Sequence, residues 1–252
     1  MAEYRELNIS DLHIPYHDPY ALDLFLRVVQ VVRPTAINLI GDLCDFYEVS
    51  KFDKDPEEFK RRGLQPALDK WFEIAGEIVR VAGSGCAVGL LPGNHEARMY
   101  KYLCRHAELA DLRALQIPNL LRLDELGIAW HEDEISVANG NLVLKHGDIV
   151  RKESGDSAKG ELAKERYAVS TLTGHTHRLG TTYVTTRNGV VMGQENGCLC
   201  DLNPKYIKRP NWQLGFTLTL HWGKDLFHLA DVPILGHESH MKCVVLDQMV
   251  TL

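Results

Sequence analysis

The first hundred residues alternate between short apolar runs and longer segments whose apolar positions recur at helical spacing. The runs at 7–10, 36–40 and 87–91 predict buried strands. Between them, apolar residues three and four apart predict helices over 19–32 and about 56–81. This strand–helix order favours parallel pairing of the strands in an α/β sheet.

The second half of the chain is richer in strands. Turn residues separate paired runs and so predict three hairpins, at 135–137 with 142–145, 181–186 with 190–194, and 215–221 with 226–231. A further strand is expected at 169–173, and the segment 97–130 is predicted to be mostly helical. This segment leaves directly from a polar loop, so we expect any lid there. With no repeat and no linker, 1–252 is predicted to be a single domain.

Composition narrows the class of protein. The chain has 252 residues, 45% of them hydrophobic and 25% charged, as expected for one globular domain. A net charge of −6 gives no support for a general nucleic-acid-binding face, although a local basic patch remains open. The N-terminus lacks a signal-peptide pattern, no apolar run suits a membrane helix, and six cysteines include no C-x-x-C pair. We therefore expect a cytoplasmic protein with reduced thiols and no membrane partner, and leave the oligomeric state open.

Five polar motifs each follow a predicted strand. They are Asp11-Leu12-His13, Gly41-Asp42-Leu43-Cys44-Asp45, Gly93-Asn94-His95-Glu96, His146-Gly147 and Gly174-His175-Thr176-His177. Sites in α/β sheets assemble at strand ends, and glycines permit the sharp turns that such loops need. Carboxylate, imidazole and amide oxygen are ligands that divalent transition metals accept. The motifs therefore predict a metal site.

In order and spacing these motifs resemble those of the calcineurin-like metallophosphoesterases, over residues 11–177. The resemblance implies a fold of two mixed β-sheets packed as a sandwich and flanked by helices. It also implies two divalent ions, and a bridging hydroxide that attacks the phosphorus of a phosphodiester or phosphomonoester. We expect manganese, with iron, zinc, cobalt and nickel as alternatives, because the predicted ligands include no thiolate.

The resemblance also implies a role for each motif residue. One ion would be held by Asp11, His13, Asp42 and His177, and a second by the bridging Asp42 together with Asn94, His146 and His175. His95 would act as general acid, or alternatively as a hydrogen-bond donor beside the site. Asp45 would orient the His95 ring, with an N-cap of the following turn as its alternative. Glu96 is expected to serve the N-terminus of the helix that starts at 97.

Other residues near the motifs are candidates for contact with a substrate. Arg98 and Arg178 could bind a phosphate, with plain surface charge as the alternative, and His17 could line the rim. The basic run 205–209 with Trp212 could contact a nucleic acid, although a solvated loop is preferred. Cys198 and Cys200 share a strand face and could reach a ligand together, but a buried pair of small residues is preferred.

Two positions depart from the protein Ser/Thr phosphatases of the superfamily. Ile14 stands where they have glycine, and Phe46 stands where they have an arginine that helps to bind phosphate. The D-x-H and G-H-T-H forms look more like the nuclease, nucleotidase and phosphodiesterase branches, and the segment 195–216 resembles phage-encoded members. We therefore favour a nucleotide or nucleic-acid substrate. A protein Ser/Thr phosphatase is the alternative enzyme, and a non-catalytic protein-binding scaffold with this fold is the alternative of another class.

Overall fold

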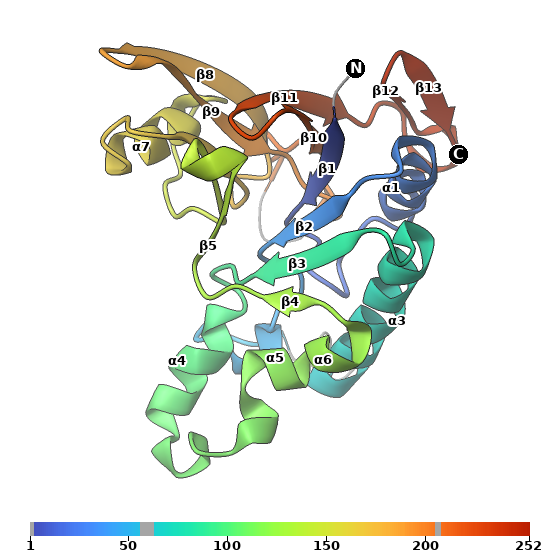
Figure 1. Ribbon diagram of the computed structural model, residues 1–252. Helices are drawn as coiled ribbons and strands as arrows, with labels where there is room; N and C mark the ends of the chain where they lie inside the picture. Colours follow the sequence, from blue (N-terminus) through green and yellow to red (C-terminus); the bar gives the residue numbers. More distant parts are fainter. Residues whose placement is uncertain (1–2, 56–62, 205–207) are drawn as a thin grey trace.

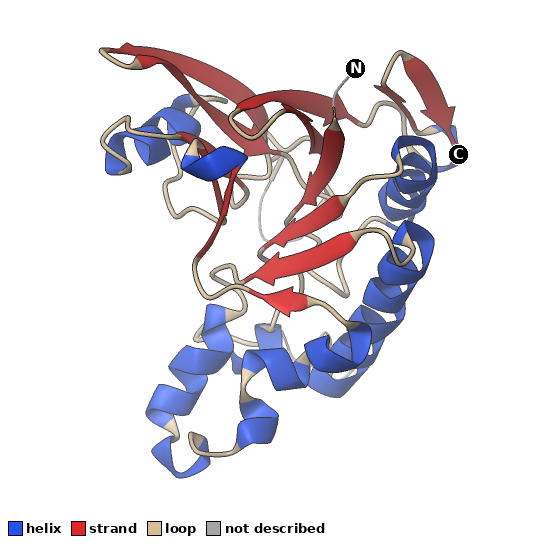
Figure 2. Ribbon diagram, viewed as in Figure 1, coloured by secondary structure: helices blue, strands red, loops and turns tan. Residues whose placement is uncertain are grey.

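Two mixed β-sheets face each other, and helices cover their outer sides (Figures 1 and 2). The computed structural model describes residues 3–55, 63–204 and 208–252. The α/β architecture expected from the sequence is thus confirmed. Within the described residues no helix is both long and apolar enough to cross a membrane.

The first sheet carries the N-terminal half of the chain. Its order is β11-β10-β1-β2-β3-β4. The parallel strands are β1 (Tyr4–Ile9), β2 (Ala36–Ile40), β3 (Ala87–Leu91) and β4 (Ala129–Trp130), and the hairpin of β10 (Gly215–Trp222) and β11 (Leu226–Pro233) extends the sheet beyond β1. The two-residue β4 lies in the segment predicted to be mostly helical, and was missed. Parallel strands place their carboxyl ends along one edge.

Two long helices cover the outer face of this sheet: α1 (Pro19–Val32) and α3 (Leu64–Ala82). The α1 bounds match the prediction because both ends are encoded locally. Asp18 accepts hydrogen bonds from the backbone N–H groups of Tyr20 and Ala21, and Pro34 follows the last turn. Of the helix predicted over 56–81, residues 56–62 lie outside the described residues, and α3 begins at Leu64.

The second sheet has the order β5-β6-β7-β9-β8. Its strands are β5 (Glu134–Val137), β6 (Leu142–Lys145), β7 (Ser170–Thr173), β8 (Leu179–Thr186) and β9 (Gly189–Asn196), and β6, β7 and β9 are parallel. The predicted hairpins are present. Helix α7 (Asp156–Lys164) packs on β7, β8 and β9 and was not predicted, because it buries small residues such as Ala158 and Gly160 rather than an apolar stripe.

The segment after β3 is largely helical, as expected. It forms α4 (Ala97–Arg105), α5 (Ile117–Leu120) and α6 (Leu123–Leu126), with single 3₁₀ turns at Ala107–Leu109 and Arg113–Leu115. The indole N–H of Trp71 in α3 donates to the carbonyl oxygen of Leu121 at 2.9 Å, which fixes the end of the segment. Helix α4 reaches outward from the strand ends (Figure 1). A lid role for this segment stays a prediction.

The space between the two sheets is partly apolar and partly polar, since a smaller apolar cluster joins Ile40 of β2 to Leu144 of β6. Gln194 on β9 donates across the gap to the Thr217 hydroxyl on β10 at 2.8 Å. Beside it, Asn38 donates to Asn8 and Asn8 to Thr219, each at 2.8 Å. The main apolar core instead lies between the first sheet and its helices, where the rings of Phe25 and Phe216 pack 5.3 Å apart.

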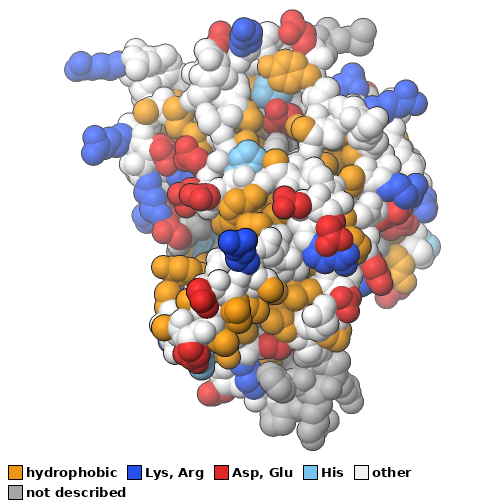
Figure 3. Space-filling view, turned by 60° about the horizontal axis from the view of Figure 1, so that its bottom comes forward, with side chains coloured by type: hydrophobic (Ala, Val, Ile, Leu, Met, Phe, Trp, Pro, Cys, Tyr) orange, Lys and Arg blue, Asp and Glu red, His pale blue; other side chains and the backbone are white. Residues whose placement is uncertain are grey.

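The C-terminal residues add a small hairpin of β12 (Lys242–Val245) and β13 (Gln248–Thr251) beside α1. Short 3₁₀ turns occur at Tyr47–Val49, Ala138–Gly140 and Glu238–His240. Figure 3 shows one face of the molecule, on which acidic and basic side chains are interspersed and hydrophobic side chains gather toward the lower half.

Candidate metal centre

The loops after β1, β2 and β3 of the first sheet meet the loops after β6 and β7 of the second. They bring together all seven side chains that the motifs singled out as ligands. One group joins Asp11, His13 and His177, and another joins Asp42, His146 and His175; within each group the ligand atoms lie within 4.8 Å of one another. The Asn94 amide oxygen lies 3.2 Å from Nε2 of His146. The two groups share one site between the sheets.

Two buried carboxylates dominate the charge of this site. Asp11 and Asp42 are 0% and 1% exposed, and among the described residues neither forms an ion pair with a lysine or arginine. Their ionic partners are imidazoles: His177 Nε2 lies 3.2 Å from Asp11, and His146 Nε2 lies 3.2 Å from Asp42. Buried carboxylates need a cation or hydrogen bonds to remain ionised.

The shifts in pKa have the same origin. Burial opposes ionisation of Asp11, yet the field of His177 and the hydrogen bonds of the neighbouring imidazoles hold its pKa well below the usual value. Burial would likewise lower the pKa of His146, but the Asp42 carboxylate raises it to about 9. Asp42 thus retains a proton on His146, whereas burial lowers the pKa of His177 despite the nearby Asp11. A divalent cation could replace the proton on His146. The donor set therefore fits the metal ions that the motifs predict.

Hydrogen bonds orient the rings. His146 Nδ1 lies 3.0 Å from the carbonyl oxygen of Ile40, which turns Nε2 toward Asp42 and Asn94. Such a carbonyl contact on the far ring nitrogen is usual for histidines that bind metal. His13 and His177 face each other through their Nε2 atoms at 2.9 Å.

Most of the predicted ligands have an unusual backbone conformation, which directs their side chains toward the site. Five of the seven predicted ligands have φ between 50° and 71°, in the left-handed region that few residues other than glycine adopt: Asp11, His13, Asp42, His175 and His177. Each such residue costs on the order of 1–3 kcal/mol, and these conformations cluster at functional sites. The motif loops therefore bring the predicted ligands together at a cost in backbone conformational energy.

The motif glycines serve two purposes. Gly41 has φ +88°, which agrees with the predicted sharp turn. Gly93 and Gly174 do not have positive φ; instead a Cβ atom would overlap the carboxylate of Asp42 at Gly93, and that of Asp11 at Gly174. These two glycines let the backbone approach the carboxylates closely.

Glu96 has a role that the sequence did not indicate. Its buried carboxylate accepts hydrogen bonds from the backbone N–H groups of Asp42, Leu43 and Cys44 at 2.8 to 3.1 Å, and from that of Gly93 at 2.8 Å. Glu96 stands at the N-cap position of α4 as expected, but its side chain makes no capping hydrogen bond to that helix. Burial, and then the nearby Asp42, raise its pKa. Glu96 ties the loop after β2 to the loop after β3.

Asp45 lies against two motif histidines. Its carboxylate is 3.3 Å from His95 Nδ1 and 3.4 Å from His13 Nδ1, and its carbonyl oxygen is 3.0 Å from His95 Nδ1. The alternative role as an N-cap does not hold, because the turn at Tyr47–Val49 has no side-chain cap. Asp45 is placed where it can orient the His95 ring.

Of the three residues suggested for substrate contact, Arg98 lies at the site. Its guanidinium is 2.8 Å from His95 Nε2 and donates to the Asp45 carboxylate at 3.0 Å. Arg178 instead donates to the carbonyl oxygens of Arg151 and Lys152, so its guanidinium is engaged by that loop. His17 forms a backbone bridge to Cys200 and is half-buried.

Two further neighbours of His177 emerge only in three dimensions. The Cys200 sulfur lies 3.7 Å from His177 Nδ1, and Cys198 completes a cluster within 4.8 Å, so the two cysteines are buried as expected yet lie beside a motif histidine. The Trp212 ring lies against His177 with centroids 4.2 Å apart. Of the basic run 205–209 that was considered together with Trp212, residues 205–207 lie outside the described residues.

The comparisons with known proteins establish the family. The chain belongs to the family of the Gene 54 proteins of two mycobacterial phages: it is 30% identical over 241 residues to that of Mycobacterium phage L5 and 31% identical over 244 residues to that of Mycobacterium phage D29. Each match covers 90% of this chain and 92% of the relative. The expected likeness to phage-encoded proteins is thus confirmed, and no model of a described protein family matches.

Solved structures with a related fold are more distant. Vps29 of Entamoeba histolytica complexed with Zn²⁺ is 15% identical with a TM-score of 0.49, and 98% of each chain is covered. A dimetal phosphatase from Danio rerio is 14% identical with a TM-score of 0.43, covering 100% of this chain and 99% of the other. At this level the likeness concerns the fold.

Proposed function

We propose that this protein is a metal-dependent phosphoesterase of the calcineurin-like type. The observation that carries the proposal is the convergence of all five motifs, from two sheets, on one buried cluster of carboxylates and imidazoles. Structural histidines scattered through a fold do not share one site with two buried aspartates that pair with no lysine or arginine among the described residues.

The proposed ligands divide into two sets that share one residue. One ion is held by Asp11, His13, Asp42 and His177, and the other by Asp42, Asn94, His146 and His175. The central place of Asp42 supports its bridging role, since its carboxylate lies 3.2 Å from His146 and 3.8 Å from His13. Two divalent ions held there would supply neutralisation of the phosphoryl charge and a water molecule of lowered pKa as the nucleophile. We expect manganese to support activity.

Three residues beside the ligands act on the substrate side of the site. His95 donates a proton to the leaving oxygen, and Asp45 keeps its ring in place through Nδ1. Arg98 binds a phosphate oxygen with the guanidinium that also contacts Asp45. Phe46, by contrast, is buried, so it takes no part in binding phosphate.

A nucleotide or nucleic-acid phosphodiester is the substrate class that we favour. The motif forms support it, and so does the gathering of basic side chains beside Asn94. Hydrolysis of model phosphate esters separates this proposal from a protein Ser/Thr phosphatase and from a protein-binding scaffold.

The test is hydrolysis of bis-p-nitrophenyl phosphate and of p-nitrophenyl phosphate, after removal of metal with EDTA and again after addition of Mn²⁺. Activity restored by Mn²⁺ and higher on the diester supports a phosphodiesterase. Preference for the monoester, together with release of phosphate from a phosphoserine peptide, would support the protein phosphatase. Loss of all hydrolysis with every candidate metal would favour the scaffold.

A further inference from the structure

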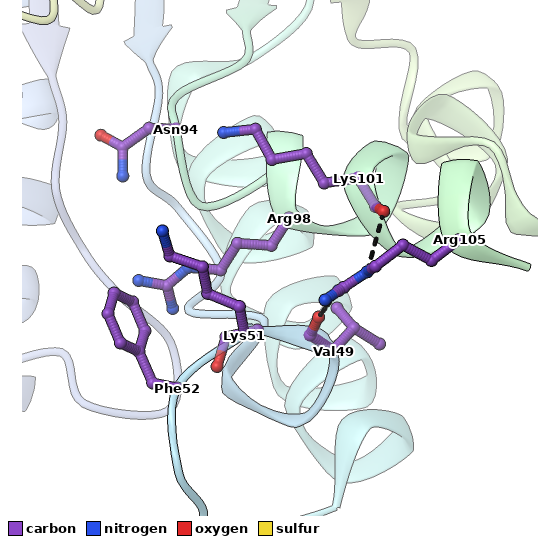
Figure 4. A pocket seen from close by; sticks show the side chains of 8 residues that line it. Val49, Lys51, Phe52, Asn94, Arg98, Lys101 and Arg105 are labelled. Carbon is purple, nitrogen blue, oxygen red and sulfur yellow. Dashed lines mark hydrogen bonds between the residues drawn. The ribbon is translucent and has the colours of Figure 1, made fainter.

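A cavity of about 430 Å³ opens beside the metal centre (Figure 4). Asn94, a proposed ligand, lines one side of it. Lys51, from the loop after β2, and Arg98 and Lys101, from α4, line it as well. In Figure 4 the ends of these three basic side chains lie toward Asn94 and Phe52. The cavity therefore borders the proposed reaction site at Asn94.

The described residues leave most of the positive charge in this cavity without an acidic partner. Arg98 forms an ion pair with Asp45, but the side-chain nitrogens of Lys51 and Lys101 form no hydrogen bond or ion pair with any described residue. Arg105 donates to the carbonyl oxygens of Val49 and Lys101, so it is held in place without an acidic partner. In a chain of net charge −6, basic groups gathered in a concave site favour an anionic ligand.

An aromatic ring completes the cavity. Phe52 is 59% exposed, and its ring centre lies 5.8 Å from the Arg98 guanidinium and 5.9 Å from the Lys51 nitrogen. Exposed aromatic rings among basic side chains are the platforms on which nucleic-acid-binding proteins stack bases. Phosphate and base are thus the two chemical groups that this cavity suits.

We propose that the cavity binds a second phosphate of a nucleotide substrate, next to the phosphate that is hydrolysed. Lys51 and Lys101 bind the second phosphate, and Phe52 stacks on a base. The inference rests on the proposed phosphoesterase function and adds residues that none of the five motifs contains. Two kinds of molecule carry this chemistry: a polynucleotide strand and a nucleoside polyphosphate.

Two pairs of substrates distinguish a polynucleotide strand from a nucleoside polyphosphate as the ligand of the cavity. With the Mn²⁺-loaded protein, kcat/KM for cleavage of the internal diester is compared between TpT and pTpTp, and kcat/KM for phosphate release between dTMP and dTDP. A charge-assisted contact predicts about a tenfold or larger advantage for the more phosphorylated member, which carries two further phosphates in the first pair and one in the second. An advantage in the first pair identifies a polynucleotide, and in the second a nucleoside polyphosphate. Equal values within both pairs would overturn the proposal.

Variants of the lining residues test whether the kcat/KM advantage of the more phosphorylated substrate arises in the cavity. The double variant Lys51→Gln/Lys101→Gln should reduce the advantage to about twofold or less. Lys242→Gln removes an exposed charge on β12, outside the cavity, and should preserve it. Phe52→Leu should lower kcat/KM on TpT by about fivefold or more, because stacking is lost. An unchanged advantage in the double lysine variant would contradict the assignment.

A binding experiment separates failure of this inference from failure of the proposed function. If the wild-type protein hydrolyses no phosphate ester with any metal, the enzyme proposal fails, but titration of pTpTp into EDTA-treated protein still tests the cavity. The lysine variant should bind more weakly, with a smaller slope of log K against log salt by about 0.7 for one lost phosphate contact. Equal affinity of wild type and variant would refute the second-phosphate site.

Discussion

The Glu96 carboxylate accepts a hydrogen bond of 2.8 Å from the backbone N–H of Leu43, 53 positions earlier in the chain. Through this and its other backbone contacts, one buried side chain holds the proposed bridging ligand Asp42 and the proposed ligand Asn94 in their relative positions. Precision at the centre therefore depends on a residue that binds no metal itself.

Glu96→Gln should destabilise the protein even without metal. A glutamine can accept at only one side-chain atom, so buried N–H groups of the loops lose a partner, at about 1–3 kcal/mol for each group. We expect the free energy of unfolding, measured with denaturant in EDTA, to fall by about 2 kcal/mol or more. Glu73→Gln, at an exposed ion pair on α3, is the control and should change it by under about 0.5 kcal/mol. Equal stability of the two variants would exclude the proposed role of Glu96.

Gly93→Ala should disrupt the centre because its new methyl group would overlap the Asp42 carboxylate. We expect a loss of about 2 kcal/mol or more in unfolding free energy and loss of bound metal. Gly85→Ala is the matched control, since a Cβ atom there meets nothing within 4 Å and its φ is not positive. Metal content by elemental analysis, with denaturant unfolding, would check both. Normal metal content in Gly93→Ala would show that the close approach is dispensable.

His95→Ala should leave both metal ions bound but lower kcat by on the order of 100-fold or more, because proton donation to the leaving oxygen is lost. His237→Ala, at an exposed histidine, is the control and should keep full activity. The measurement is kcat on bis-p-nitrophenyl phosphate alongside metal content. Unchanged kcat in His95→Ala would remove this residue from the reaction.

Removal of metal should lower thermal stability. Ions that bind only the folded protein stabilise it by about 2.7 kcal/mol at a hundredfold excess over Kd, so Mn²⁺ should raise Tm over EDTA by on the order of 5 °C or more. Asp42→Asn should lose most of this increase, since the residue is proposed to contact both ions. A variant that still retained two equivalents of metal would contradict the bridging role.

Elements with local sequence signals were predicted accurately. Strand β3 is a continuous apolar run and β2 is apolar apart from Asn38, and both are buried along nearly their whole length. Helix α1 carries an N-cap and a following proline. Helix α7 and the short strand β4 lack such signals. The β12–β13 hairpin was also missed, although its residues alternate between buried and exposed along β12.

The proposed ligands could be identified from the sequence because each belongs to a compact motif at a strand end. The contacts that hold these ligands in place could not be identified from the sequence. Glu96 contacts a loop far away in the chain, Trp212 reaches His177 from a separate segment, and Lys51 and Lys101 come together only because a loop and α4 line one cavity. Such pairings depend on the tertiary fold, which local patterns do not encode.

The division of the centre between the two sheets also bears on how the protein matures during synthesis. Asp11, His13, Asp42 and Asn94 emerge from the ribosome well before His146, His175 and His177, and β1 does not gain its neighbour β10 until residues 215–222 have been made. A nascent chain therefore carries only half a coordination shell on an incomplete sheet. Binding of the proposed ions would accordingly be a late event, because the ligands from the second sheet are present only after β7 has been made.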